Sequence, residues 1–164
     1  MLEIRPATPA DVHAILRFIR ELAEYEREPD AVTATTDDLL RHGFGDAPLF
    51  RVLMASHDGA EAGFAFYFFQ YSTWTGAPVL YLEDLYVTPA HRKLGIGKAL
   101  MHRLASIAVD AGCKRFQWAV LDWNTPAIGF YESIGARVLP DWRTVRVDGD
   151  ALSTLAAPAP VATP

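Results

Sequence analysis

The sequence lacks the features of several protein classes. It has one cysteine, Cys113, in 164 residues, which excludes an internal disulfide bond. Its five histidines show no metal-ligand spacing, so we expect no metal site. No apolar run is long enough to span a bilayer, and residues 1–6 lack a signal-sequence pattern, so we expect a cytoplasmic chain without a membrane partner.

Basic residues are also in deficit. The chain has 15 Lys and Arg against 20 Asp and Glu, a net charge of −5, which argues against a nucleic-acid partner and suits a small cationic ligand. The hydrophobic fraction of 51% excludes overall disorder, and the length fits a single domain, expected over residues 1–156. Residues 157–164 are rich in alanine and proline, which predicts a disordered tail.

A glycine-containing loop at residues 92–97 follows the apolar run 79–87 and precedes the helix-period segment 97–111. This layout binds phosphate, because backbone N–H groups of the loop and of the first helical turn point at the anion. Glycines let the backbone approach closely, and Arg92 and Lys93 add positive charge. An ordinary strand–helix connection has the same short motif, so the loop alone leaves both readings open.

Two adjacent carboxylates interrupt the strand-like run 81–87. Side chains alternate between the two faces of a strand. One face therefore carries Tyr81, Glu83, Leu85 and Val87, and the other carries Leu82, Asp84 and Tyr86. An acid on an apolar face is desolvated, which raises its pKa and makes it a candidate base. The alternative is a solvated strand end.

The remaining pattern predicts an α/β fold, a mixed twisted sheet with helices on both faces. Strands are expected at residues 2–5, 50–56, 63–71, 79–87, 114–120 and 143–147. Helices are expected after Thr8, from a cap at Thr36 to about residue 44, at residues 97–111 and 124–134, and as a last turn at residues 149–156.

Taken together, these segments resemble the GNAT superfamily of acetyl-CoA-dependent N-acetyltransferases. Within it the chain is similar to the diamine/thialysine acetyltransferase group, which includes the spermidine/spermine N-acetyltransferases. The matching segments are residues 21–26, 38–45, 71–74 (YSTW), 81–84 (YLED), 92–97, 121–124 (LDWN), 130–131 and 135–136. The resemblance covers residues 3–156 and is specific because the YLED, DWN and FY runs occur in that order.

The resemblance implies that the central strand and the strand at 114–120 splay apart around acetyl-CoA. The pantetheine arm is expected to pair with the edge of the central strand, and the pyrophosphate to lie on the glycine loop. The implied acetyl-CoA contacts are Leu85, Tyr86, Val87, Arg92, Lys93, Leu94, Gly95, Ile96, Gly97, Lys98, Asn124 and Tyr131. Asn124 is equally a helix N-cap, and both roles are compatible.

Amine acetylation requires a base, because at pH 7.4 only about one alkylamine in a thousand is neutral. The family match assigns this base to Glu83 and the acid that protonates the departing thiolate to Tyr131, which is otherwise a core aromatic. Backbone N–H groups near Tyr86 or Val87 are expected to stabilise the oxyanion.

Substrate contacts are expected from the first helix end and from loops. The residues are Tyr25, Glu26, Ser72, Trp74, Glu83, Asp84 and Trp142. Both tryptophans are candidates for packing as well as for aromatic walls. The polyamine-acetylating branch of the family carries aspartate at the position of Ser72, so serine favours an amino-acid-like amine such as thialysine. The resemblance also implies a homodimer.

Three alternatives stay open at this stage. The first is a diamine or polyamine N-acetyltransferase of the spermidine/spermine type. The second is an enzyme that acetylates protein N-termini or lysines, which needs an open groove. The third is a non-catalytic acyl-CoA sensor, which needs neither Glu83 nor Tyr131.

Overall fold

The computed structural model describes residues 1–157. The chain divides into two compact units, Met1–Ala119 and a second unit that begins at Val120. The expectation of a single domain over residues 1–156 stays a prediction. The predicted tail lies outside the described residues from residue 158 onward.

The first unit is built on a five-stranded sheet with the order β1-β2-β3-β4-β5. Neighbouring strands from β1 to β4 are antiparallel, and β5 is parallel to β4. The strands are β1 (Leu2–Pro6), β2 (Arg51–His57), β3 (Ala60–Ser72), β4 (Ala77–Val87) and β5 (Arg115–Trp118). This mixed sheet confirms the predicted α/β class.

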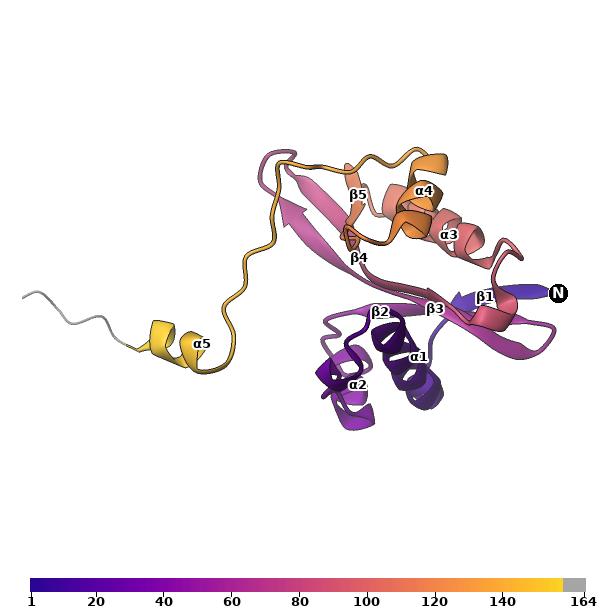
Figure 1. The fold of residues 1–164 in the computed structure, drawn as a ribbon, viewed down its shortest axis with the longest axis horizontal. Coiled ribbons are helices and arrows are strands. Elements are labelled where there is room, and N and C mark those ends of the chain that lie inside the picture. Colours follow the sequence, from indigo (N-terminus) through magenta and orange to yellow (C-terminus); the bar gives the residue numbers. More distant parts are fainter. Residues whose placement is uncertain (158–164) are drawn as a thin grey trace, which may run out of the picture. The chain divides into compact units, whose positions relative to one another are not determined.

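Helices of the first unit cover both faces of the sheet, with α1 and α2 on one face and α3 on the other (Figure 1). The cap predicted at Thr36 is wrong by one residue, because the N-cap of the second helix is Thr35. The Thr35 hydroxyl accepts a hydrogen bond from the Asp38 N–H at 3.2 Å. The helices are α1 (Val12–Tyr25), α2 (Thr36–Gly43) and α3 (Ile96–Asp110), with 3-10 turns at Pro9–Asp11, Pro29–Ala31 and Pro89–His91.

Aromatic packing fixes α1 against the centre of the sheet. The Phe18 ring stacks on Phe64 of β3 with 5.6 Å between centroids, and it lies 6.0 Å from the Tyr86 ring of β4. On the α3 face, Leu100 and Leu104 are fully buried. Each fully buried side chain of this size contributes about 1.5 to 3 kcal/mol. The strand β4 and the helix α1, which carry the candidate acids, therefore share one packed core.

A bulge at Glu83 changes the predicted faces of β4. Asp84 pairs with Phe66 and Leu82 pairs with Tyr67, so Glu83 has no partner of its own on β3. Since successive residues of β3 face opposite sides, Leu82 and Asp84 also lie on opposite faces. The predicted alternation, which put Leu82 and Asp84 on one face, is therefore wrong. A bulge adds one residue to one strand and shifts every side chain beyond it.

The second unit contains α4 (Thr125–Ser133) and α5 (Gly149–Ala156). The last helical turn predicted at residues 149–156 is confirmed. The strand predicted at residues 143–147 is wrong, because this segment is irregular. Its alternating pattern is compatible with a strand, but none of the described strands pairs with it.

Candidate active site

The carboxyl-terminal half of β4 has an open edge. Parallel pairing with β5 begins at Val79 and ends where Leu82 meets Trp118. From Glu83 to Val87, no other described strand continues the sheet on this side. The bulge and the end of pairing therefore coincide, and they expose backbone groups to which an extended ligand arm can add as a further strand. The pairing of these two strands ends as expected, whereas the splay between them stays a prediction, because β5 itself ends at Trp118.

Strand register decides which backbone groups face this edge. The Thr88 N–H donates to the Ala62 carbonyl of β3 at 2.9 Å. In an antiparallel pair, the groups that face the partner alternate along the strand, so those of Tyr86 also face β3. The N–H and C=O groups of Leu85 and Val87 consequently face the open edge. The sequence left the oxyanion donor open between Tyr86 and Val87, and the register favours Val87.

The two adjacent acids of β4 lie in different environments. Glu83 is exposed, whereas Asp84 is largely withdrawn from solvent on the α1 face. Burial, and after it the negative charges of Glu83 and Glu26, together raise the pKa of Asp84 to about 7. The prediction of a desolvated carboxylate therefore holds for Asp84, whereas Glu83 corresponds to the solvated alternative.

The C-terminal end of α1 brings a third carboxylate to this region. Burial raises the pKa of Glu26, the residue that ends the helix. The next residue, Arg27, has a φ of 68°, in the left-handed region that non-glycine residues avoid. The Arg27 N–H donates to the Glu24 carbonyl at 3.1 Å and the Glu28 N–H donates to the Ala23 carbonyl at 2.9 Å, which is a Schellman motif. This motif fixes the position of Glu26.

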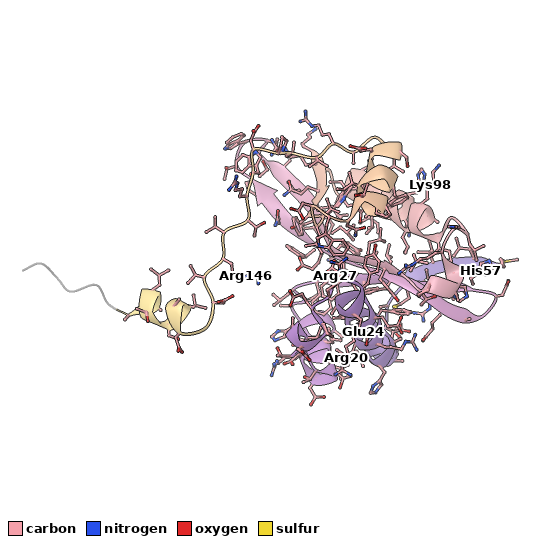
Figure 2. All side chains as sticks on the ribbon, in the orientation of Figure 1. Arg20, Glu24, Arg27, His57, Lys98 and Arg146 are labelled. Carbon is pink, nitrogen blue, oxygen red and sulfur yellow. The ribbon has the colours of Figure 1, made fainter. Side chains whose placement is uncertain are left out.

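No salt bridge among the described residues involves Glu26, Glu83 or Asp84. Glu24 and Arg27 lie on the α1 side of the sheet in Figure 2, and Lys98 lies on the α3 side. The charges of Glu83 and Glu26 act on Asp84, so the three carboxylates form an acidic cluster, and a bound cation lowers its electrostatic energy.

The glycine loop leads into α3 as predicted. Lys93 and Gly95 both have positive φ values, of 65° and 78°, and Gly95 is the N-cap of the helix. The helix begins at Ile96, one residue earlier than expected, so the N–H groups of Ile96, Gly97 and Lys98 have no partner within the helix. Together with the helix dipole they fit the pyrophosphate of acetyl-CoA.

The side chain of Arg92 points back toward the sheet and α1. Its Nε donates to the Val87 carbonyl at 3.1 Å. Its guanidinium carbon lies 5.1 Å from the Tyr25 ring centroid and 5.9 Å from that of Tyr86. From the sequence, Arg92 is expected to be a positive charge of the glycine loop and an acetyl-CoA contact. Its contacts with Val87, Tyr25 and Tyr86 were not predicted, because local sequence gives no signal for them.

Ser72, the last residue of β3, and Trp74, in the turn that follows it, lie at the far end of β4. The Ser72 hydroxyl accepts a hydrogen bond from the Thr75 N–H at 3.3 Å, which leaves its own proton available to donate. Trp74 is 80% exposed. From Ala77 to Glu83, β4 extends about 20 Å at roughly 3.3 Å per residue. Within one chain, the structure therefore does not bring Ser72 and Trp74 together with Glu83.

Three predicted site residues belong to the second unit. Asn124 is buried, and its side-chain oxygen accepts a hydrogen bond from the Ala127 N–H at 3.3 Å, which confirms its role as the N-cap of α4. Tyr131 lies on α4 with its ring 5.3 Å from that of Phe130. Trp142 is 72% exposed in the irregular segment before α5. The acetyl-CoA, acid and substrate roles of these residues stay predictions.

No group of three or more His, Cys, Asp or Glu side chains among residues 1–157 is arranged to hold a metal ion. None of the helices within the same range is both long and apolar enough to cross a membrane.

Comparison with known proteins gives one consistent result. The model of the Acetyltransferase (GNAT) family matches residues 13–136. The thialysine N-epsilon-acetyltransferase of Sus scrofa is 42% identical over 93% of this chain and 96% of that protein. The spermidine/spermine N(1)-acetyltransferase-like protein 1 of Homo sapiens is 42% identical over 94% of this chain and 24% of that protein. An integron cassette protein of V. cholerae has a similar structure, with a TM-score of 0.80 and 28% identity over 96% of this chain and 98% of that one.

An open strand edge that ends at a helix N-terminus is therefore, in this chain, the framework of an acyl-transfer enzyme. The chain belongs to the acetyltransferase (GNAT) family. It is an N-acetyltransferase, an enzyme that transfers an acetyl group to an amine.

Proposed function

We propose that this enzyme acetylates the side-chain amine of a small amino-acid-like substrate such as thialysine, with acetyl-CoA as the acetyl donor. The observation that carries the proposal is the acidic cluster of Glu26, Glu83 and Asp84 beside the open edge of β4. A cationic amine is attracted to this cluster, and an acetyl group on that edge lies next to it.

The donor is held by backbone groups in this proposal. The pyrophosphate binds the N–H groups at the start of α3, and the pantetheine arm pairs with Leu85 and Val87 at the open edge. The Val87 N–H is the donor for the oxyanion that forms when the amine attacks the thioester. Leu94, Lys93 and Lys98 flank the pyrophosphate.

Proton transfer is assigned to two side chains. Glu83 removes the proton from the ammonium group, directly or through water, because only the neutral amine attacks the thioester. Tyr131 returns a proton to the thiolate of coenzyme A, since a phenol is protonated at neutral pH. Asp84 and Glu26 hold the positive charge of the incoming amine, and Asn124 contacts the donor in addition to capping α4.

We also propose that the active enzyme is a homodimer. Its support is the separation of about 20 Å along β4 between Glu83 and the turn that carries Ser72 and Trp74, which is longer than a small amino acid. The turn of one protomer then serves the acidic cluster of its partner. Exposed apolar residues of the second unit, among them Trp142 and Leu155, supply further surface for the dimer contact.

Mixing two inactive variants tests the shared site. Glu83→Gln removes the base and Trp74→Ala removes the aromatic wall. If the turn serves the partner, a refolded mixture contains heterodimers with one intact site, and about a quarter of wild-type activity returns. If both residues serve the same protomer, every site keeps one defect and no activity returns. Each variant alone, treated identically, is the control.

Ser72 supports the amino-acid-like substrate over a polyamine. Its hydroxyl proton is available to a substrate carboxylate, whereas the polyamine branch has a carboxylate there that pairs with a distant ammonium group. The difference is worth about 5- to 150-fold in kcat/KM. A diamine or polyamine is the second candidate, since the 42% identity to the human spermidine/spermine-like protein favours it equally.

The deciding experiment compares thialysine, lysine, putrescine and spermidine by release of free coenzyme A thiol. We expect wild type to prefer thialysine and Ser72→Asp to shift the preference toward polyamines. Thr73→Asp, which adds the same charge at the next exposed position, is the matched control. A wild-type preference for spermidine contradicts the proposal, and a peptide as the best substrate identifies a protein acetyltransferase instead. Binding of acetyl-CoA without turnover of any acceptor identifies a sensor.

A single cysteine and the absence of any internal disulfide suit a reducing compartment, and the cytoplasm is the location that we propose.

A further inference from the structure

Arg92 connects two parts of the molecule that the reaction must bring together. On one side, its Nε donates to the Val87 carbonyl at the open edge of β4. On the other, its guanidinium carbon lies 5.1 Å from the ring centroid of Tyr25, the last residue of α1. A planar guanidinium can do both at once, because its donors lie in the plane and its face packs on an aromatic ring.

Further contacts extend this connection along α1. Burial and the nearby carboxylate of Glu21 on α1 together raise the pKa of Tyr86 to about 12, and Arg92 acts in the opposite direction. Glu21 lies 3.3 Å from Arg17, and Arg17 is bound at 2.7 Å to Glu61 of β3. Arg92 and Glu21 thus both act on Tyr86, and Arg17 holds the same helix to β3 at Glu61.

The two groups that Arg92 holds have different tasks in the proposed function. Val87 belongs to the edge that accepts acetyl-CoA, whereas Tyr25 precedes Glu26 of the acidic cluster that accepts the amine. The distance between these two parts sets how closely the amine approaches the thioester. A misplacement of about 1 Å is enough to lower a rate about 100-fold.

We propose that Arg92 is a positioning residue that ties the acetyl-CoA edge of β4 to the amine-binding end of α1, and that it is not a ligand of the pyrophosphate. The positive charge near the pyrophosphate comes from Lys93 and Lys98. The proposal rests on the proposed function, because it assumes that the donor binds the β4 edge and the amine binds the acidic cluster.

Two substitutions separate positioning from charge. Arg92→Lys keeps the positive charge but loses the Nε donor and the planar face. Lys93→Gln, at the next residue of the same loop, removes a charge that makes no salt bridge among the described residues. The measurements are calorimetric binding of acetyl-CoA in the absence of amine, and KM and kcat for the best amine of the panel.

For Arg92→Lys we expect kcat/KM for the amine to fall by about tenfold or more while the Kd of acetyl-CoA changes by less than about threefold. For Lys93→Gln we expect the opposite, a weaker acetyl-CoA affinity that depends on salt, with an unchanged amine KM. Wild-type behaviour of Arg92→Lys, or a loss confined to acetyl-CoA binding, overturns the proposal.

Hydrogen exchange tests the tie without any turnover. In Arg92→Lys we expect faster exchange of the amides of residues 26–28, where α1 ends, and of Tyr86 and Thr88, whose N–H groups face β3, with the centre of β3 unchanged. Unchanged exchange at both places overturns the tie, and faster exchange throughout the sheet shows a general loss of fold instead. Tyr25→Leu, which removes the ring under the guanidinium, should reproduce the first pattern. If wild type acetylates no amine, the proposed function fails, yet this measurement still decides whether Arg92 joins the two parts.

Discussion

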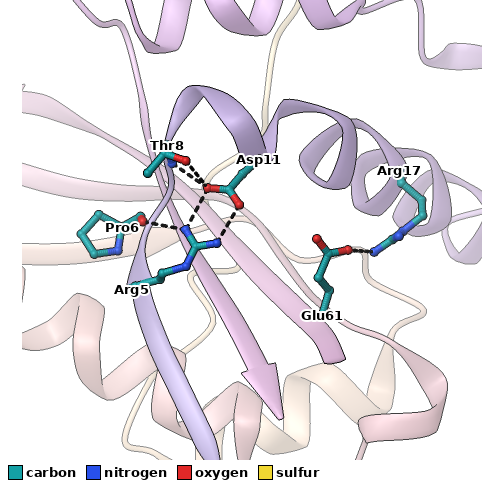
Figure 3. A network of polar contacts seen from close by, with 6 residues as sticks. All are labelled: Arg5, Pro6, Thr8, Asp11, Arg17 and Glu61. Atoms are coloured by element: carbon teal, nitrogen blue, oxygen red, sulfur yellow. Dashed lines mark hydrogen bonds and ion pairs between the residues drawn. The ribbon is translucent and has the colours of Figure 1, made fainter. Parts of the chain in front are cut away.

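Two aspartates, one near each end of helix α1, have opposite pKa shifts. At the N-terminal end, Asp11 receives hydrogen bonds of 2.7 and 2.8 Å from Arg5 and of 2.7 and 2.9 Å from Thr8 (Figure 3). These bonds, those from Arg5 first, hold the pKa of Asp11 far below its ordinary value. At the C-terminal end, burial and the charges of Glu83 and Glu26 raise the pKa of Asp84 to about 7.

This contrast separates a structural acid from a functional one. The partners of Asp11 are supplied by the chain itself, so its charge stabilises the fold. No salt bridge among the described residues compensates the charge of Asp84. The fold therefore carries an electrostatic cost at one end of the helix, and in the proposed function a cationic substrate offsets that cost when it binds.

The largest effect is expected from the exposed acid at the functional end. Glu83→Gln should lower kcat at pH 7 by about 100-fold or more, since the ammonium group then loses its base. The loss should shrink as the pH approaches the pKa of the amine, while calorimetric acetyl-CoA affinity stays the same. Glu24→Gln, at an exposed position of α1, is the control and should have wild-type kcat. An unchanged rate for Glu83→Gln rules Glu83 out as the essential base.

The structural end is tested by Asp11→Asn. We expect the free energy of unfolding at pH 7 to fall by about 2 to 3 kcal/mol, a value reduced for the partial exposure of Arg5. Because the folded pKa of Asp11 is lowered, its contribution is present above the unfolded pKa and is lost as the pH falls through the folded one. Urea denaturation at pH 7 measures the difference, with Asp37→Asn on exposed α2 surface as the control. Equal stability of Asp11→Asn and wild type would remove the contrast.

The same substitution at the other end should have the opposite sign. A folded pKa near 7 against an unfolded value of 3.8 means that the folded state binds more protons between these values, so wild-type stability falls as pH rises from about 4 to 7. Asp84→Asn avoids this loss and should be more stable than wild type by about 1 to 3 kcal/mol at pH 8. At pH 4 the two proteins should differ little.

Thermal or urea unfolding at the two pH values checks this, and amine kinetics provide the second readout. Asp84→Asn should raise the KM of the cationic amine while it stabilises the protein. A variant that is less stable than wild type at pH 8 would show that Asp84 is compensated by a group that strengthens its ionised form.

The smallest effect concerns the backbone at the C-terminal end of α1. Arg27 has a φ of 68° in the position where glycine usually ends a Schellman motif. Arg27→Gly should therefore be more stable than Arg27→Ala by about 0.5 to 1 kcal/mol, since both lose the guanidinium and only alanine keeps the strained Cβ. Urea denaturation of the pair isolates the backbone contribution. Equal stabilities would mean that the helix end relaxes without strain.

Local signals carried much of the prediction. The glycine loop and the Asn124 cap depend on neighbouring residues, and the structure confirms both. The observed strand and helix boundaries differ from the predicted ones by a few residues, because hydrogen bonding at element ends depends on the partner strand or helix. The prediction of a strand at residues 143–147 was wrong for a related reason, since an alternating pattern does not specify which strand it pairs with.

The sequence predicted which residues form the candidate site but not the environment of each side chain. The YLED run predicted Glu83 and Asp84 as a pair of site residues. Only the pairing of β4 with β3 shows the bulge, which leaves Glu83 exposed and Asp84 largely withdrawn from solvent. A bulge is a property of two strands, so one strand's pattern cannot reveal it. The contacts of Arg92 with Val87 and Tyr25 likewise join residues that are 5 and 67 positions apart (92 − 87 and 92 − 25).

The sequence by itself determined the family, the order of elements and the residue types that the chemistry needs, because motifs and periodicity are local properties of the chain. Tertiary structure alone decided the environment of each charge. Asp11 and Asp84 are the same residue type, and burial beside either Arg5 or two other carboxylates gives them opposite pKa shifts. Electrostatic energy depends on distances and solvent exposure in three dimensions, so the role of an ionisable side chain is settled only when the chain is folded.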